Sequence, residues 1–127
     1  MTPRERFAAS RVAHLATVTP SGAPHLVPIV FALVDDVIVT AVDGKPKRHR
    51  GLQRLVNIAH EPRVSVLADC YDEDWSSLWW VRADGVASVT DAPSPELVAR
   101  YPQYETAPPP GPFLRIRVAK WTAWSAS

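Results

Sequence analysis

The chain has 127 residues, of which 46% are hydrophobic and 21% charged, and its formal net charge is +1. This length and composition fit one globular domain, so we expect residues 1–127 to fold as a single unit. A single cysteine, Cys70, excludes an internal disulfide. No apolar run approaches the ~20 residues of a membrane span, and the N-terminus lacks the apolar core of a signal peptide. We therefore expect a soluble cytoplasmic protein without a membrane partner.

The first predicted element is a short N-terminal helix. Thr2, Pro3 and Glu5 are typical of a helix start, because threonine caps the first turn, proline fits its first position and glutamate completes a capping box. This helix is expected to run to about Ser10. The apolar, β-forming residues Val12–Thr19 then predict a first strand.

Two further strands are predicted before the basic part of the chain. Pro24–Val34 is nearly continuous in hydrophobicity, which predicts a strand buried on both faces. Pro28 cannot donate a hydrogen bond to a neighbouring strand, so we expect an edge or a bulge there. Within it, Leu26–Phe31 is compatible with an apolar wall for a ligand, although its hydrophobic periodicity favours a core strand. Val37–Ala41 is the third predicted strand.

Positive charge is concentrated in Asp43–Arg63. The segment carries six basic side chains against two acidic ones, namely Lys45, Lys47, Arg48, Arg50, Arg54 and Arg63 against Asp43 and Glu61. Pro46 and Gly51 predict a loop as far as Gly51, and the apolar spacing of Leu52–Ala59 predicts a short amphipathic helix. The basic residues fit an anion such as a phosphate, although a solvated basic face gives the same pattern. Nucleic acid is disfavoured as a partner, because no aromatic residues are interleaved with the basic ones.

The second half of the chain adds three strands and one helix. The predicted elements are a strand over Val64–Ala68, an acidic and aromatic loop over Tyr71–Ser77, a longer strand over Leu78–Thr90 with an irregularity at Asp84 and Gly85, a helix from Ser94 to about Arg100, and a strand over Phe113–Trp124. Six closely spaced strands with three short helices predict a mainly β fold, a small antiparallel barrel. Such a barrel fills its interior with side chains, so a ligand is expected outside it, in a cleft shared with a second subunit.

No group of residues forms a self-sufficient catalytic site. The four histidines lack metal-ligand spacing, and neither a nucleophile elbow nor a phosphate-binding glycine loop is present. An enzyme of this sequence would therefore rely on a bound cofactor. Trp79 and Trp80 are adjacent on a predicted strand and point to opposite faces, so one of them needs a subunit interface or a ligand to cover it.

Several stretches of the sequence together resemble a known superfamily. They are HLVPIVFALVDDVIVTAVDGKPKR, LQRLVNIAHEPRVSVLADCYDEDWSSLWWVRADG, RYPQY and the final WTAW. In this order they resemble the pyridoxamine-phosphate-oxidase-like split β-barrel superfamily, and more narrowly its branch of oxidoreductases that use the deazaflavin coenzyme F420. The resemblance covers about residues 11–124. It implies a six-stranded antiparallel split β-barrel of the FMN-binding type, and a homodimer with two equivalent cofactor clefts at the subunit interface.

The resemblance also implies positions for the cofactor. The phosphate and acidic tail of F420 would lie against basic residues of the concentrated segment, which are Lys45, Lys47, Arg48 and Arg54. The deazaflavin ring would lie along Pro28, Ile29 and Val30, with Thr40 near the linkage between ring and phosphate. Trp75 would approach the ring from the same subunit or from its partner. No catalytic residue and no metal ligand is implied.

One departure from the superfamily favours F420 over FMN. Relatives that use FMN carry basic side chains on the strand equivalent to Leu26–Val34, whereas this strand has no lysine or arginine. F420 extends further, to an oligoglutamate, which suits a displaced basic segment. We thus expect hydride transfer between reduced F420 and a small conjugated molecule, with a proton from solvent. The alternatives are an FMN- or FAD-dependent oxidoreductase of the same superfamily and a non-catalytic protein that binds a flavin, a deazaflavin or a tetrapyrrole.

Overall fold

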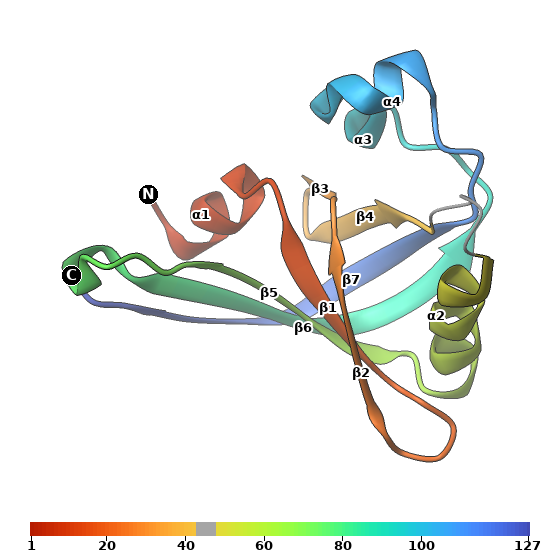
Figure 1. Cartoon of the computed structure of the whole chain (residues 1–127), viewed down its shortest axis with the longest axis horizontal. Helices are drawn as coiled ribbons and strands as arrows, with labels where there is room; N and C mark the ends of the chain where they lie inside the picture. Colours follow the sequence, from red (N-terminus) through yellow and green to blue (C-terminus); the bar gives the residue numbers. More distant parts are fainter. Residues whose placement is uncertain (43–47) are drawn as a thin grey trace.

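The computed structural model describes residues 1–42 and 48–127, and side chains of α2 from Gln53 onward. Seven antiparallel strands form one sheet in the order β2-β1-β5-β6-β7-β4-β3 (Figure 1). The strands are β1 (Ala13–Val18), β2 (Pro24–Ile29), β3 (Ala32–Val34), β4 (Val37–Ala41), β5 (Arg63–Cys70), β6 (Trp79–Thr90) and β7 (Phe113–Ser125). The helices are α1 (Pro3–Ala9), α2 (Arg48–His60), the 3-10 turn η1 (Trp75–Ser77), α3 (Pro95–Arg100) and α4 (Pro102–Thr106).

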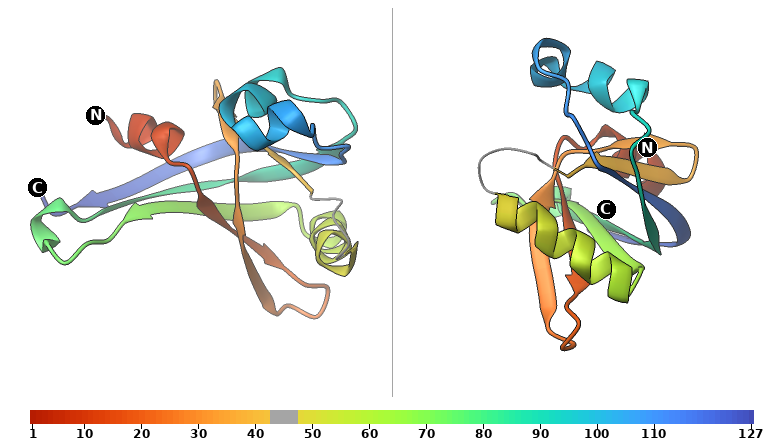
Figure 2. Two further views of the ribbon diagram at one scale, coloured as in Figure 1. Left: turned by 45° about the horizontal axis from the view of Figure 1, so that its top comes forward. Right: turned by 90° about the vertical axis from the view of Figure 1, so that its right-hand side faces the viewer.

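The sheet curls into a half-barrel around a core on its inner side. α1 packs against β6, α2 against β1 and β6, and α3 against β3, so the helices surround the sheet (Figure 2). The larger core cluster includes the fully buried Leu15, Val66 and Ile116. A smaller cluster, under α3, includes Leu97 and Phe113. A mainly β split barrel is thereby confirmed. No helix among the described residues is both long and apolar enough to cross a bilayer.

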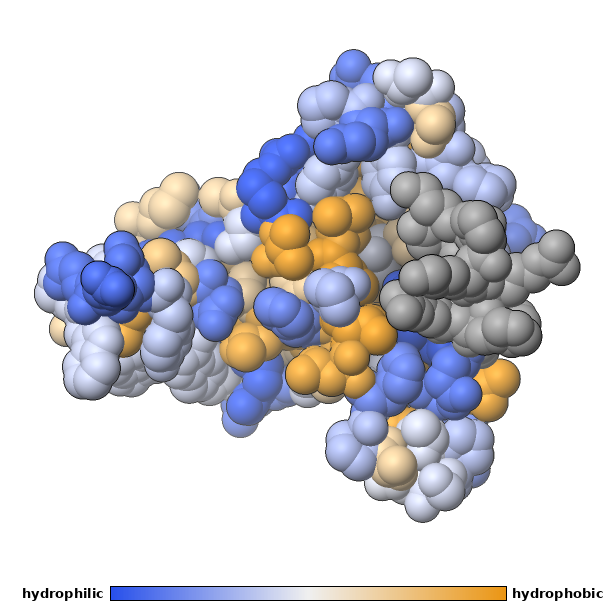
Figure 3. Space-filling view, viewed as in Figure 1, coloured by the Kyte–Doolittle hydropathy of each residue, from blue (hydrophilic) through white to orange (hydrophobic). Residues whose placement is uncertain are grey.

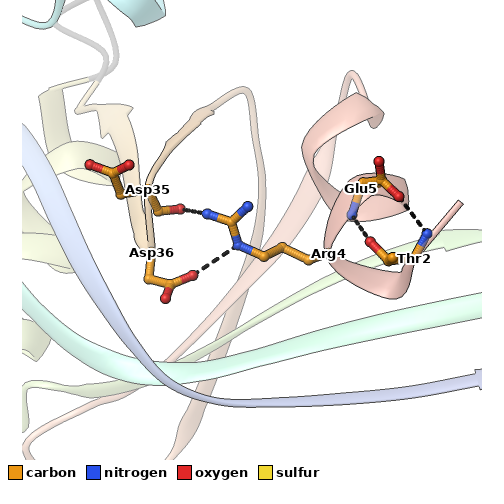
Figure 4. A network of polar contacts seen from close by, with 5 residues as sticks. All are labelled: Thr2, Arg4, Glu5, Asp35 and Asp36. Carbon is orange, nitrogen blue, oxygen red and sulfur yellow. Dashed lines mark hydrogen bonds and ion pairs between the residues drawn. The ribbon is translucent and has the colours of Figure 1, made fainter.

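The N-terminal helix is held at its first turn and at its one buried side chain. The predicted capping box is confirmed, because Glu5 N donates to Thr2 Oγ1 over 3.1 Å and Thr2 N donates to Glu5 Oε1 over 2.7 Å (Figure 4). Hydrogen bonding of the Glu5 carboxylate with the backbone and the side chain of Thr2 lowers the pKa of Glu5. Phe7 is fully buried, with its ring 4.9 Å from that of Phe31. Local capping and one aromatic anchor together dock this short helix on the barrel.

A second contact ties α1 to the β3–β4 hairpin. Arg4 Nε donates to Asp36 Oδ1 over 2.9 Å, and its Nη2 donates to the backbone oxygen of Asp35 (Figure 4). Asp35 has a φ of 54°, the left-handed conformation that aspartate tolerates in tight hairpin turns. The arginine therefore binds the hairpin at the turn that reverses the chain.

The predicted second strand is wrong in two respects. It breaks at Val30 and Phe31, which separates β2 from β3 and gives seven strands instead of six. β2 is also not buried on both faces, because it is an edge strand whose alternate residues are exposed. The edge predicted for Pro28 is confirmed: it pairs with His14 of β1, and no strand among the described residues pairs with the other side of β2. The long hydrophobic run is thus divided between two short edge strands, β2 and β3.

Two helix boundaries also differ from the prediction. α2 begins at Arg48, so the loop expected as far as Gly51 ends earlier. A glycine in a helix costs about 1 kcal/mol relative to alanine, and tertiary packing of α2, including the buried Ile58, offsets it. Pro102 ends α3 as predicted, but it also occupies the first position of α4, which the sequence analysis did not predict. The irregularity predicted at Asp84 and Gly85 is confirmed as a register shift against β7.

Candidate functional site

One side of the sheet is open, and we name it the outer face. It consists of the side chains of β2, β1, β5 and β6 that point away from the core: Leu26, Pro28, His14, Ala16, Ser65, Leu67, Asp69, Trp80 and Arg82. Most of them line a groove of about 630 Å³, and Tyr71 completes its lining. Leu26 and Tyr71 are each 67% exposed. An apolar surface of this kind with a polar rim is typical of a ligand or subunit contact.

Hydrophobic residues also gather on the front of the molecule. In the space-filling view they lie at the centre of the face, over β1, β2 and β3 (Figure 3). Leu26 of β2 and Val12, just before β1, are among the large hydrophobic side chains with high exposure. The open apolar surface therefore reaches the end of β2, where the cofactor ring was predicted.

A polar cluster lies beside the groove, on β5 and β6. Ser65 Oγ donates to Asp84 Oδ1 over 2.7 Å, and Arg82 Nε donates to the same oxygen over 3.1 Å. The hydrogen bond from Ser65, aided by Arg82 and by the charge of Lys120, lowers the pKa of Asp84. Asp84 is therefore ionised at neutral pH and does not serve as a proton donor.

The residues predicted to face the deazaflavin ring lie at the end of β2, but they do not all point the same way. Pro28 is exposed on the outer face, whereas Ile29 is 5% exposed and belongs to the core. Val30 follows the strand and is partly buried. Thr40 Oγ1 donates to the backbone oxygen of Val30 over 2.7 Å, which joins the predicted linkage residue to the predicted ring wall. A ligand on the outer face could therefore contact only the backbone of Ile29, because its side chain lies in the core.

The basic residues are only partly described by the structure. Lys45 and Lys47 lie outside the described residues, and Arg48 is the first residue of α2, with its side chain outside the description. Arg54 lies within α2 and is 9% exposed. Contact of these four residues with a phosphate stays a prediction. Arg54 is therefore largely buried against the barrel, although its positive charge would predict an exposed side chain.

A buried amide holds α2 in place. Asn57 is fully buried, and its Nδ2 donates to Thr17 Oγ1 of β1 over 3.0 Å. Gln53 Nε2 donates to Asn57 Oδ1 over 2.7 Å. The helix that begins with the basic residues is thus fastened to the barrel by side-chain hydrogen bonds. The sequence analysis did not identify Asn57, because an asparagine off the apolar stripe of a helix usually faces water.

Trp75 does not meet the other predicted residues within one protomer. It is 76% exposed on η1, in the connection between β5 and β6. That connection lies at the opposite end of the molecule from α2 (Figure 1). If Trp75 approaches a cofactor beside Pro28 and α2, it does so from a partner subunit.

A second polar cluster, the α3 hub, was missed by the sequence analysis. Tyr101 Oη accepts a hydrogen bond from Phe31 N over 3.0 Å and lies 2.9 Å from Phe31 O, to which it can donate. Arg100 Nη1 donates to Phe31 O over 2.5 Å, and Nη2 donates to Ser10 O. Burial lowers the pKa of Arg100. The only sequence signal for this cluster was the adjacent pair Arg100 and Tyr101 in the stretch RYPQY, to which no role was assigned. No metal site is formed by the described residues.

Comparison with known proteins identifies the family. Residues 3–125 match the family described as pyridoxamine 5'-phosphate oxidase, and the chain therefore belongs to that family. This confirms the superfamily resemblance and the split-barrel fold at the family level. No curated protein sequence matches the chain significantly.

Solved structures share the fold over almost the whole chain. A conserved hypothetical protein, Rv2991, from Mycobacterium tuberculosis is 26% identical, with a TM-score of 0.70 over 99% of this chain and 86% of its own. An FAD-binding protein (mll6688) from Mesorhizobium loti is 21% identical, with a TM-score of 0.64 over 94% and 89%. A heme-binding protein from Mycobacterium smegmatis is 21% identical, with a TM-score of 0.64 over 98% of this chain and 56% of its own.

Proposed function

We propose that this protein is an oxidoreductase that binds coenzyme F420 on the outer face and reduces a small conjugated molecule. The observation that carries the proposal is the apolar, uncharged wall at the end of β2. Pro28 is exposed there and β2 contains no lysine or arginine, whereas six basic residues are concentrated in residues 43–63. A flat apolar ring fits the wall, and an extended anionic tail fits the basic segment.

The described residues fit the ring part of this cofactor. Thr40 fixes the carbonyl of Val30 by its 2.7 Å hydrogen bond, so the backbone beside the wall is held in one position. The outer-face groove has aromatic and aliphatic lining from Trp80, Leu67 and Leu26. Such a surface excludes water from one side of a planar ring, which favours hydride transfer over side reactions.

The protein's own residues would mainly bind and orient the cofactor and the acceptor, and they would not need to exchange protons with them. When bound, reduced F420 would supply the hydride, and solvent would supply the proton that completes reduction of the acceptor. Asp84, the acidic group of the polar cluster, stays ionised because of its hydrogen bonds. The remaining task is alignment of ring and acceptor, which contributes to the rate by proximity.

A homodimer is part of the proposal. Leu26, Tyr71 and Trp75 are all more than half exposed, which is costly unless a second surface covers them. A second copy placed on the outer face would cover these side chains and would bring Trp75 of one subunit toward α2 of the other. Replacing Leu26 with Asp should then give a folded monomer, measured by sedimentation velocity. A wild-type chain that is already monomeric at micromolar concentration would contradict this part of the proposal.

A flavin is the second candidate cofactor, because the neighbour from Mesorhizobium loti is named as FAD-binding. A binding protein without turnover is the candidate from another class, and the neighbour named as heme-binding supports it. Both are folded like this chain at identities of 21%, a level at which the likeness concerns the fold alone.

A titration separates these candidates. The purified protein is titrated with F420, FMN, FAD and heme, and binding is followed by the absorbance of each ligand. We expect tight binding of F420 only, and replacement of Lys47 and Arg48 by Ala should weaken it by ~2–4 kcal/mol if both make charge-assisted hydrogen bonds to phosphate. A double variant of the exposed Arg115 and Arg117 to Ala serves as the control. Preferential binding of a flavin, or unchanged F420 affinity in the folded variant, would overturn the assignment.

A further inference from the structure

A second groove lies beside the end of β2, and we name it the tyrosine–proline groove. Its volume is about 630 Å³, within the range of small-molecule sites. Its lining comes from the start of β1, the end of β2, α4 and the loop after α4: Arg11, Val12, Val30, Tyr101, Pro102, Gln103, Tyr104, Ala107 and Pro108–Pro110. Of the predicted cofactor residues whose side chains the structure describes, only Val30 lines it.

The lining is flat, apolar and aromatic. The rings of Tyr101 and Tyr104 meet edge to face with their centroids 5.9 Å apart. Pro102 and Pro108–Pro110 also line the groove, together with Val12, which is 49% exposed. Surfaces of this kind receive planar conjugated molecules, because aromatic and proline rings offer flat contact at little entropic cost.

Arg11 gives the groove one fixed positive charge. Its guanidinium lies over the Tyr101 ring, 4.7 Å from the centroid, and Nη2 donates to the backbone oxygen of Arg100 over 2.8 Å. The two contacts hold one end of the guanidinium, while a guanidinium carries five N–H donors in all. Among the described residues, the lining contains no aspartate or glutamate. An arginine held in this way, with no carboxylate among the described lining residues, is suited to an anionic ligand.

The groove meets the predicted cofactor wall at Val30. Val30 lines the groove, and its carbonyl oxygen accepts the hydrogen bond from Thr40. The next residue, Phe31, is held through its N–H and its carbonyl by Tyr101 and Arg100 of the α3 hub. A molecule in the groove and a ring along Pro28 and Val30 would therefore share one rigid piece of backbone.

We infer that the tyrosine–proline groove binds the acceptor, and that the acceptor is a planar conjugated carboxylate whose anionic group pairs with Arg11. The assignment of the bound molecule as acceptor rests on the proposed function, whereas its binding does not. Reduction of such an acid adds a hydride from the cofactor to one carbon of its double bond and a solvent proton to the other, so the cofactor loses two electrons.

Equilibrium dialysis without cofactor tests the inference, with cinnamate and its neutral amide, cinnamide, as probes. We expect cinnamate to bind roughly tenfold more tightly than cinnamide, the gain of one charge-assisted contact. Arg11→Gln should abolish this preference, and Arg11→Lys should keep part of it. The control, Arg117→Gln, removes an exposed arginine of β7 and should keep all of it. Ala107→Trp should fill the groove and weaken both probes.

The outcomes separate the groove from the cofactor. Equal affinity for the two probes, no binding of either, or a preference that survives in Arg11→Gln would each overturn the inference, whatever the F420 titration gives. A cinnamate preference that depends on Arg11 would establish the site. If the same protein then fails to bind F420, the proposed function falls while the anion site stands.

Discussion

Two polar clusters, each with one arginine, make hydrogen bonds to different kinds of partners in this molecule. In the α3 hub, Arg100 and Tyr101 hydrogen-bond to backbone groups of Ser10 and Phe31, which are far from them along the chain. On the outer face, Arg82, Ser65 and Asp84 hydrogen-bond mainly to one another, and the side chains of Arg82 and Asp84 are 42% and 33% exposed. The first cluster joins segments that are far apart in the sequence, and the second joins the paired strands β5 and β6. Stability is expected to depend on the first, and surface properties on the second.

The largest effect is expected at Arg100. Replacement by Met removes donors from the carbonyls of Phe31 and Ser10, so we expect the free energy of unfolding to fall by about 2–4 kcal/mol. Urea denaturation followed by tryptophan fluorescence measures it. Arg115→Met, at an exposed position of β7, is the control and should change stability by less than about 0.5 kcal/mol. Equal effects at both sites would show that the hub is not a stabilising cluster.

Tyr101→Phe should have the next largest effect. The variant keeps the ring but leaves the buried N–H of Phe31 without its acceptor, at a cost of about 1–2 kcal/mol. Tyr71→Phe, at a side chain 67% exposed, provides the matched control. Amide hydrogen exchange at Phe31 should accelerate in Tyr101→Phe alone. Protection of that amide as strong as in the wild type would exclude the proposed hydrogen bond.

A smaller and pH-dependent effect is expected at Asp84. Its pKa is lowered in the folded state, so the ionised carboxylate stabilises the protein above its unfolded pKa, and this stabilisation is lost as the pH falls through the folded pKa. Asp84→Asn should cost less than about 1 kcal/mol at neutral pH, with the difference from wild type vanishing well below roughly pH 4. Ser65→Ala should raise the pKa of Asp84, measured by NMR titration. A pKa unaffected by Ser65→Ala would refute the stated cause.

The smallest effect is expected at Arg82. Its ion pair with Asp84 is 3.1 Å long but partly exposed to solvent, and such pairs contribute about 0–0.5 kcal/mol. Arg82→Gln should therefore denature at nearly the same urea concentration as wild type, and the remaining difference should shrink in high salt. If Arg82→Gln lowers the free energy of unfolding as much as Arg100→Met, the two clusters do not differ in their contribution to stability.

Much of the fold could be predicted because its signals are local. The capping box of Thr2 and Glu5, the strand at Val37–Ala41, and the irregularity at Asp84 and Gly85 all depend on neighbouring residues, and all are confirmed. The break at Val30 and Phe31 depends on Tyr101 and Arg100, which lie far along the chain, so no local pattern marks it.

The candidate site could be predicted less fully than the fold. The family resemblance predicted one site that includes Pro28, Val30 and Thr40, and the structure places these residues near the end of β2. The inward direction of Ile29 was not foreseen, because a continuous apolar run gives no alternation to show which side chains face out. Arg11 and the tyrosine–proline groove were missed as well. Their residues come from three separate parts of the sequence, and only the folded chain joins them.

The order of the strands has a consequence for the folding pathway. β2 and β3 are consecutive in the sequence yet lie at opposite edges of the sheet, and β4 pairs with β7, whose residues come near the end of the chain. The β5–β6 and β1–β2 hairpins involve nearby residues, so they close at low entropic cost and are expected to form early. The β4–β7 pairing must bring together Val39 and Arg115, and it is expected to limit the folding rate. During synthesis, the β3–β4 hairpin would therefore await the C-terminal strand that completes the half-barrel.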